Sequence, residues 1–179
     1  MFYNHIKVIY MNIAFIDGQN LILSCRKAKN PWELNFSRFR EYLREKYNVE
    51  KAIYYIGAYY KKNEDLYNEI IHAGFTLQFR RHSGFSKSKK KGNVDTDIVF
   101  DVMKHVIKDK SFDQIILVSG DGDYFNMVEF LINDGWFCKL LAPDKKKMSS
   151  LYKKLEPRYY DYLNREEVMH KIKKIAGSA

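Results

Sequence analysis

The sequence predicts an α/β fold in which buried strands alternate with helices. Apolar runs of strand length, such as residues 115–118, contain β-branched residues and lack polar alternation, which is typical of strands buried on both faces. Between these runs, apolar residues recur at helical spacing, as they do over residues 94–107. This alternation predicts a doubly wound parallel sheet, and right-handed crossovers then place the carboxyl ends of its strands along one edge.

The expected elements follow in chain order. Strands are predicted over residues 8–16, 52–59, 75–79, 115–118 and 136–142. Helices are predicted from a cap near Asn35 or Ser37 to Tyr47, then over residues 64–73 and 94–107, from Tyr124 to a stop at Gly135, and over residues 149–155 and 165–175. Residues 21–30 carry few signals and are interpreted as a connection. The chain is expected to be one domain over residues 1–179, with a core over 12–143 and a helical extension over 144–179.

Composition narrows the class of protein. Hydrophobic residues make up 46% of the chain, which excludes global disorder. The chain has 31 lysines and arginines against 22 aspartates and glutamates, and the net charge of +9 favours a polyanionic partner such as nucleic acid. The alternative is that this charge only promotes solubility.

Cellular location is constrained by the cysteines and by the apolar runs. Cys25 and Cys138 lie far apart without metal-binding spacing, which indicates reduced thiols and a cytoplasmic protein. No apolar run approaches the roughly 20 residues that a membrane span needs, so no membrane partner is expected. The first five residues are too short and polar for a signal peptide.

Acidic residues follow two of the predicted strands. Asp121 and Asp123 lie in the turn after residues 115–118, and Asp17 follows the first strand in the segment Asp-Gly-Gln-Asn. Because carboxyl ends of parallel strands share one edge, these carboxylates are expected to converge there. Alternatively, Asp121 or Asp123 only caps the following helix and Asp17 only forms a turn beside Gly18.

A third acidic segment opens the helix that begins at Val94. At about 100° per residue, Asp95 shares the face of Ile98 and Val102 that packs on the sheet. We therefore expect Asp95 to point toward the strand ends, although acids in a first turn also favour the helix dipole. Asp97 is predicted to be solvated. The role of Asp101 is left open, since it can pair with Lys104 or His105.

Four converging carboxylates, from Asp17, Asp95, Asp121 and Asp123, would repel one another unless a cation neutralised them. An oxygen-only ligand set favours Mg²⁺ or Mn²⁺ over zinc, and the five histidines are scattered along the chain. One or two such ions activate water and stabilise the leaving oxygen in phosphodiester hydrolysis. The acidic arrangement is therefore what a nuclease needs.

Basic segments surround the predicted acidic edge and would hold the phosphate backbone that the acids repel. The candidates are Arg80, Arg81, Lys87, Lys89, Lys90, Lys91, Lys145 and Lys146. The alternative is that residues 83–93 form a solvated loop. Tyr59 and Tyr60 could stack on bases, but half-buried wall residues are the favoured interpretation.

Three motifs together resemble a known family. They are Ala14-Phe15-Ile16-Asp17-Gly18-Gln19-Asn20, Lys91-Gly92-Asn93-Val94-Asp95-Thr96-Asp97 with Asp101 behind it, and Val118-Ser119-Gly120-Asp121-Gly122-Asp123-Tyr124-Phe125. Over residues 12–143 the chain resembles the NYN domain of the LabA-like group, within the PIN-like nuclease superfamily. The resemblance implies a PIN-like three-layer α/β/α fold, with about five parallel strands in the order 3-2-1-4-5.

The resemblance also implies a metal-dependent ribonuclease site. Asp17, Asp95, Asp121 and Asp123 would be the metal-binding catalytic acids, and Asn20 and Ser119 would support them or the scissile phosphate. The extra residue Asn93 between Gly92 and Val94 departs from the family pattern and shifts the register of that loop. The lysine-rich loop and the terminal helix lie outside the pattern, and this helix is interpreted as packing or self-association, which would allow a homodimer.

Three functions remain as alternatives at this point. The first is a Mg²⁺- or Mn²⁺-dependent endoribonuclease acting on RNA. The second is a module of the same fold that binds RNA or a protein and cleaves poorly or not at all. The third is another phosphoryl-transfer fold, such as a topoisomerase-primase-like domain or a phosphatase, of which only the Asp-x-Asp pattern is present.

Overall fold

The computed structural model describes residues 11–80, 94–109 and 112–175. Its centre is a six-stranded sheet in the order β3-β2-β1-β4-β5-β6, in which all neighbours pair in parallel. The strands are β1 (Asn12–Asp17), β2 (Val49–Ile56), β3 (Thr76–Phe79), β4 (Ile115–Val118), β5 (Phe137–Ala142) and β6 (Tyr160–Tyr162). The predicted order of the first five strands is confirmed, and β6 extends the sheet beyond them.

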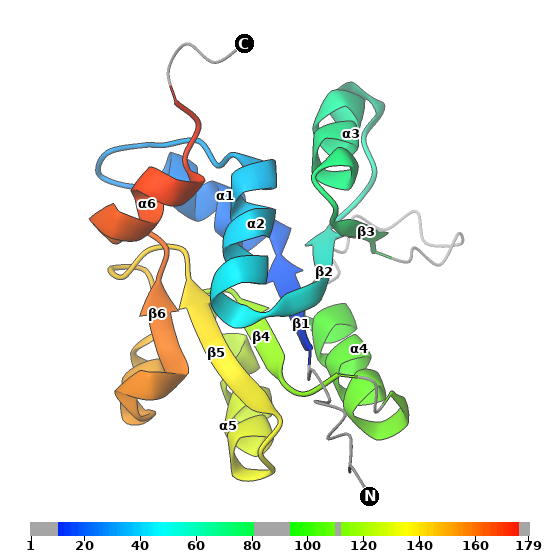
Figure 1. The fold of residues 1–179 in the computed structure, drawn as a ribbon, viewed down its shortest axis with the longest axis vertical. Coiled ribbons are helices and arrows are strands. Elements are labelled where there is room, and N and C mark those ends of the chain that lie inside the picture. Colours follow the sequence, from blue (N-terminus) through cyan, green and yellow to red (C-terminus); the bar gives the residue numbers. More distant parts are fainter. Residues whose placement is uncertain (1–10, 81–93, 110–111, 176–179) are drawn as a thin grey trace, which may run out of the picture.

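Helices lie on both faces of this sheet, so the predicted three-layer arrangement is also confirmed (Figure 1). They are α1 (Gly18–Arg26), α2 (Phe36–Tyr47), α3 (Glu64–His72), α4 (Val94–Lys108), α5 (Phe125–Asn133) and α6 (Glu166–Ile172). Short 3₁₀ turns are η1 (Lys61–Asn63), η2 (Gly122–Tyr124), η3 (Ser150–Lys154) and η4 (Pro157–Tyr159). No helix among the described residues is long and apolar enough to cross a membrane.

Alternating residues of the strands supply two separate cores. On β1, Ala14 and Ile16 pack with α1, α2, α3 and α6, while Ile13 and Phe15 pack with α4 and α5. Each of these four side chains is at most 2% exposed, as expected for a central strand of a parallel sheet. Asp17 is two residues after Phe15, so the alternation of the strand places it on the same side of the sheet as α4, where the acidic site forms.

The connection predicted over residues 21–30 was wrong, because α1 occupies Gly18–Arg26. Asp17 caps this helix, and Leu21 and Cys25 bury one face of it. The helix begins at a glycine for a steric reason. A Cβ on Gly18 would lie 2.1 Å from the Tyr54 ring and 2.6 Å from the Tyr55 carbonyl oxygen. A glycine at the start of a short, weakly patterned helix left little signal in the sequence.

Other boundaries moved by a few residues. The second strand begins at Val49 and ends at Ile56, and the expected terminal helix shortens to Glu166–Ile172. The predicted short helix near residue 150 is the 3₁₀ turn η3. Gly135 ends α5 as predicted, with a φ of +79° that L-residues rarely adopt. Residues 8–10 of the first predicted strand lie outside the described residues.

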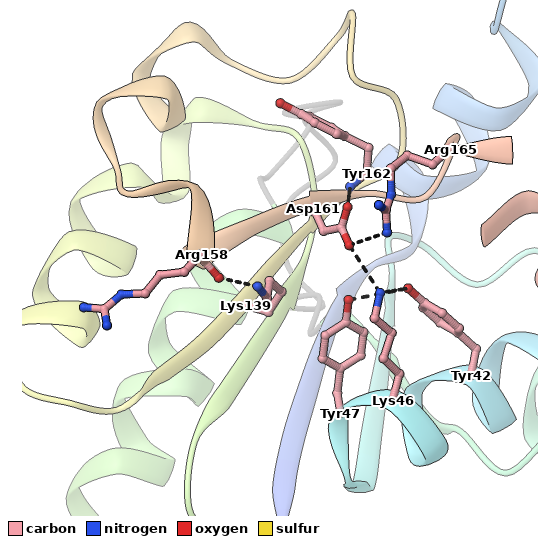
Figure 2. A network of polar contacts seen from close by, with 8 residues as sticks. All are labelled: Tyr42, Lys46, Tyr47, Lys139, Arg158, Asp161, Tyr162 and Arg165. Atoms are coloured by element: carbon pink, nitrogen blue, oxygen red, sulfur yellow. Dashed lines mark hydrogen bonds and ion pairs between the residues drawn. The ribbon is translucent and has the colours of Figure 1, made fainter. Parts of the chain in front are cut away.

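The C-terminal extension is fastened to the core by a charged network (Figure 2). Asp161 on β6 accepts from Lys46 of α2 at 3.3 Å and from Arg165 at 2.8 Å. The Lys46 ammonium group also lies over the Tyr42 and Tyr47 rings, 5.4 and 5.2 Å from their centroids. The network therefore links β6, the edge strand of the sheet, to α2, and α6 packs on the same face of the sheet as α2.

Candidate metal centre

Asp17 ends β1 and is buried, with 5% of its surface exposed. Its Oδ1 accepts a hydrogen bond from the backbone N–H of Asn20 at 2.9 Å, which caps α1. Burial raises the pKa of this carboxyl, and the charges of Asp95 and Asp121 raise it further, although its hydrogen bonds oppose this shift. Asp17 therefore forms the turn that was predicted and also lies close to the other acids.

Asp121 and Asp123 lie in the turn that follows β4. The fully buried Ser119 accepts from the Asp121 N–H through its Oγ at 3.1 Å. Asp121 Oδ1 in turn accepts from the Asp123 N–H at 3.1 Å and caps η2. Both interpretations of this motif thus apply, since Asp121 caps a helical turn and also faces the other acids.

The two acidic strand ends are tied together by Asn20. Its side-chain Oδ1 accepts a hydrogen bond from the N–H of Gly120 at 3.0 Å, while its backbone N–H donates to Asp17. One residue therefore fixes the end of β1 against the turn after β4. This geometry favours a supporting role for Asn20.

Asp95 enters the site from the first turn of α4, as the helical projection predicted. The hydroxyl of Tyr124 lies 2.6 Å from Asp95 Oδ1 and 3.2 Å from Asp17 Oδ2. A phenol has one proton to donate, so the two carboxylates share one donor. Burial and both carboxylates raise the pKa of Tyr124, which keeps the phenol protonated.

Three of the predicted acids form a compact group of ligand atoms. One carboxylate oxygen from each of Asp95, Asp121 and Asp123 lies within 4.8 Å of the others. Asp17 is not part of this group but joins it through the Tyr124 hydroxyl. All four predicted acids therefore meet at the carboxyl edge of the sheet, in an oxygen-rich arrangement suited to a hard divalent cation.

No cation within the described part of the chain neutralises this group. None of the ion pairs formed there includes Asp17, Asp95, Asp121 or Asp123. Their hydrogen-bond donors are backbone N–H groups and a phenol, which leave the net negative charge in place. The electrostatics therefore favour a positively charged ligand.

The prediction for Asp97 was wrong. Its Oδ2 is buried and has no hydrogen-bond partner among the described residues, whereas a solvated side chain was expected. The second acid on this side of α4, Asp101, accepts from the Tyr55 hydroxyl at 2.9 Å instead of pairing with Lys104 or His105. A helical projection does not predict the Tyr55–Asp101 contact, because β2 brings Tyr55 against a side of α4 that the apolar pattern assigns to solvent.

A further segment, residues 149–152, covers the acidic turn, and no sequence pattern predicted this contact. The N–H of Ser149 donates to the Gly120 carbonyl at 2.9 Å, and the Tyr152 hydroxyl donates to the Asp121 carbonyl at 2.5 Å. A Cβ on Gly122 would lie 2.6 Å from Ser149 Oγ, so this glycine allows the close approach. Neither Tyr124 nor Tyr152 carries a sequence signal for these contacts, since both resemble ordinary core aromatics.

The predicted RNA-binding residues are only partly described. Arg80, Lys145 and Lys146 follow β3 and β5 at the carboxyl edge, and both lysines are exposed. Arg81, Lys87, Lys89, Lys90 and Lys91 lie outside the described residues. Tyr59 and Tyr60 follow β2 and are 51% and 57% exposed, and the Tyr59 ring packs against Tyr67 and Phe79, which agrees with the favoured interpretation as half-buried wall residues.

Comparisons with known proteins bear on the family and on the fold. A family model described as the NYN domain matches residues 12–163. The low amplitude and bright protein LabA of Synechococcus elongatus is 27% identical over 126 residues, which are 65% of this chain and 65% of LabA. The match thus spans just under two thirds of the length of LabA. A crystal structure of a protein of unknown function from Vibrio parahaemolyticus has the same fold, with a TM-score of 0.68 and 21% identity, over 92% of this chain and 97% of the other.

Proposed function

The chain belongs to the NYN domain family, within the PIN-like nuclease superfamily, and on this premise we propose that it is a Mg²⁺- or Mn²⁺-dependent ribonuclease. The observation that carries the proposal is the acidic group of Asp95, Asp121 and Asp123, whose oxygens lie within 4.8 Å of one another. No described cation pairs with these acids.

The donor set fits a small divalent cation. Oxygens on opposite sides of an octahedral Mg²⁺ are about 4.2 Å apart, so oxygens within 4.8 Å need only a small adjustment to share one ion. Asp95, Asp121 and Asp123 would hold the ion directly. We include Asp17 in the proposed set for two reasons. Its contact with the Tyr124 hydroxyl is longer than that of Asp95, at 3.2 Å against 2.6 Å, and its negative charge attracts the same cation.

A bound divalent ion would supply activation of a water molecule and stabilisation of the charge on the leaving oxygen of a phosphodiester. The residues of the chain would hold and orient this centre. Tyr124 fixes the spacing of Asp17 and Asp95 through its hydroxyl. Asn20 and Ser119 hold the turn after β4, and because Ser119 is fully buried we assign it to supporting the acids and not to contacting the phosphate.

The substrate is proposed to be RNA with unpaired bases. Exposed tyrosines after β2 can stack on bases, and Arg80, Lys145 and Lys146 can contact phosphates along the same edge. The lysines of residues 83–93 immediately precede α4 in the chain, and because they lie outside the described residues their contact with RNA stays a prediction from the sequence. A positive surround offsets the repulsion between the acidic centre and the phosphate backbone.

The test is cleavage of a labelled single-stranded RNA by the purified chain with Mg²⁺, with Mn²⁺ or with EDTA. We expect divalent-ion-dependent cleavage that Asp121→Asn reduces by at least about a hundredfold, since it removes a charged ligand. Asp161→Asn is the matched control, because it makes the same chemical change in the network of Figure 2 and should leave the rate within about twofold.

Two outcomes would contradict the proposal. Equal background cleavage by the wild type and Asp121→Asn with both ions, with RNA still bound, would indicate a binding module. Efficient cleavage of single-stranded DNA but not RNA of the same sequence would overturn the assignment of the substrate.

A further inference from the structure

A cavity of about 430 Å³ lies apart from the acidic group. Its wall is formed by residues 28–30 and Trp32 after α1, by Asp144 and Lys146 in the turn after β5, and by residues of α6 and its flanks. Asp17, Asp95, Asp121 and Asp123 do not line it. The volume falls in the range of roughly 300–1,000 Å³ that is usual for small-molecule sites.

The unpaired charges around this cavity are cationic. Lys29, Lys146 and Lys173 line it, and among the described residues none of their ammonium groups forms an ion pair. Lys29 and Lys146 are exposed, so their ammonium groups can move toward a ligand. Three lysines on one opening favour an anion.

The acids in the wall do not cancel this charge. Asp144 is 6% exposed, and its Oδ1 accepts from the Lys146 N–H and from Asn164 Nδ2, both at 2.9 Å. Its Oδ2 lies 3.9 Å from the Lys147 ammonium group, so this carboxylate is already engaged in fixing the turn. The Glu166 side chain is 91% exposed and is therefore directed to solvent, 3.9 Å from the ring of His170.

The remaining wall suits a planar, partly apolar body. Trp32, which is 9% exposed, and Met169 provide an aromatic and an apolar surface, and Asn30 adds an amide. A ligand that combines an anionic group with a flat heterocycle matches this lining, since bases stack on aromatic side chains and phosphates attract lysines. We propose that this cavity binds a nucleoside phosphate, with the phosphate among the three lysines and the base beside Trp32.

The cavity is separate from the acidic group, but the turn after β5 contacts both. The turn that supplies Asp144 and Lys146 continues to Ser149, whose N–H donates to Gly120 beside the acids. The nucleoside phosphate can therefore be a free mononucleotide or the terminal nucleotide of an RNA strand. Neither source requires hydrolysis, so the cavity is tested separately from the proposed nuclease activity.

The test uses Trp32 as a reporter in the full chain carrying Trp136→Phe, which leaves Trp32 as the single tryptophan. Adenosine 5′-monophosphate, a 5′-phosphorylated hexaribonucleotide and inorganic phosphate are titrated in EDTA, so that no divalent ion is present for cleavage. Calorimetry on the wild-type chain repeats the titrations without the substitution. We expect saturable binding of the mononucleotide or the RNA, with inorganic phosphate at least about tenfold weaker. Binding of both nucleotide probes would indicate a free mononucleotide site, and binding of the RNA alone would indicate a strand terminus.

Paired variants identify the cavity as the place of binding. The double variant Lys29→Glu, Lys173→Glu should weaken binding about tenfold or more, while Lys108→Glu, which changes an exposed lysine at the end of α4, should not change it. Circular dichroism checks that each variant is folded. Absence of saturable binding for both nucleotide probes, equal affinity for inorganic phosphate, or full affinity in the folded double variant would overturn the proposal.

Discussion

Two groups of carboxylates differ in how their charge is balanced. Asp161, in the network of Figure 2, accepts from Lys46 and Arg165 and also from the N–H of Tyr162. At the metal centre, Asp17 and Asp95 share the neutral hydroxyl of Tyr124 instead. The first carboxylate is paired with two cations, whereas the described residues around the second group supply none.

This difference separates a structural role from a functional one. A buried acid without a cation costs stability, because its desolvation is not repaid by an opposite charge. The Asp161 network holds the extension to α2 and is complete as it stands. The acidic group lacks a cationic partner among the described residues, which supports the proposed cation site.

The largest expected effect is stabilisation by a divalent cation. Mn²⁺ at about a hundred times its dissociation constant should add about 2.7 kcal/mol to the free energy of unfolding, since it binds the folded chain selectively. Thermal unfolding with Mn²⁺ and with EDTA measures this. Asp121→Asn should lose the gain and Asp161→Asn should keep it. A gain of the same size in Asp121→Asn would place the ion elsewhere.

The next effect concerns the shared phenol. Tyr124→Phe keeps the buried ring but removes the donor between Asp17 and Asp95, and should reduce RNA cleavage about tenfold to a hundredfold and weaken Mn²⁺ binding. Tyr162→Phe on β6 is the matched control, because its ring lies beside Lys145 and outside the acidic group. Unchanged cleavage and Mn²⁺ affinity in Tyr124→Phe would limit Tyr124 to a packing role.

Removing one charge from each group should change stability in opposite directions. Asp161→Asn should lower the free energy of unfolding by about 1 kcal/mol, because Lys46 and Arg165 lose their carboxylate. Asp17→Asn should raise it by a similar amount in EDTA, because a buried charge is removed while the new amide can still cap α1. Chemical denaturation measures both. Destabilisation by Asp17→Asn would show that its charge is structurally compensated.

The smallest effect is a dependence on pH. Burial and the neighbouring acids raise the pKa of Asp17 in the folded state above its ordinary value of 3.8. As pH rises through 3.8, the unfolded chain loses this proton first, so Asp17 contributes less stability until pH passes the raised folded pKa. The stability advantage of Asp17→Asn over the wild type should therefore be small near pH 4 and larger at pH 7, in urea unfolding with EDTA. A constant difference would contradict the raised pKa.

Sequence reasoning predicted the parts of the fold that depend on strong local patterns. The apolar runs located the first five strands along the chain, the family resemblance implied their order in the sheet, and three short motifs located the acids that meet in the structure. It missed α1, whose start at Gly18 is dictated by the nearby Tyr54 ring. It also missed β6, since three residues of alternating character carry too little signal for a strand.

The contacts within the site were less predictable than its acids. Asp97 was expected in solvent, but its Oδ2 is buried. Asp101 accepts from the Tyr55 hydroxyl, and this contact depends on how β2 meets α4, which no local pattern encodes. Tyr124 and Tyr152 were not recognisable as donors to the acidic turn, because their hydroxyl partners come from distant or backbone groups. Local residues thus specify which acids are present, and tertiary packing specifies what each one contacts.

The most direct test is to locate a divalent ion in crystals of the chain soaked in Mn²⁺, using the anomalous scattering of manganese. We expect an anomalous peak among the carboxylates of Asp95, Asp121 and Asp123, and no peak there in Asp121→Asn. A well-occupied peak elsewhere with none at this cluster, at Mn²⁺ concentrations that support cleavage, would contradict it.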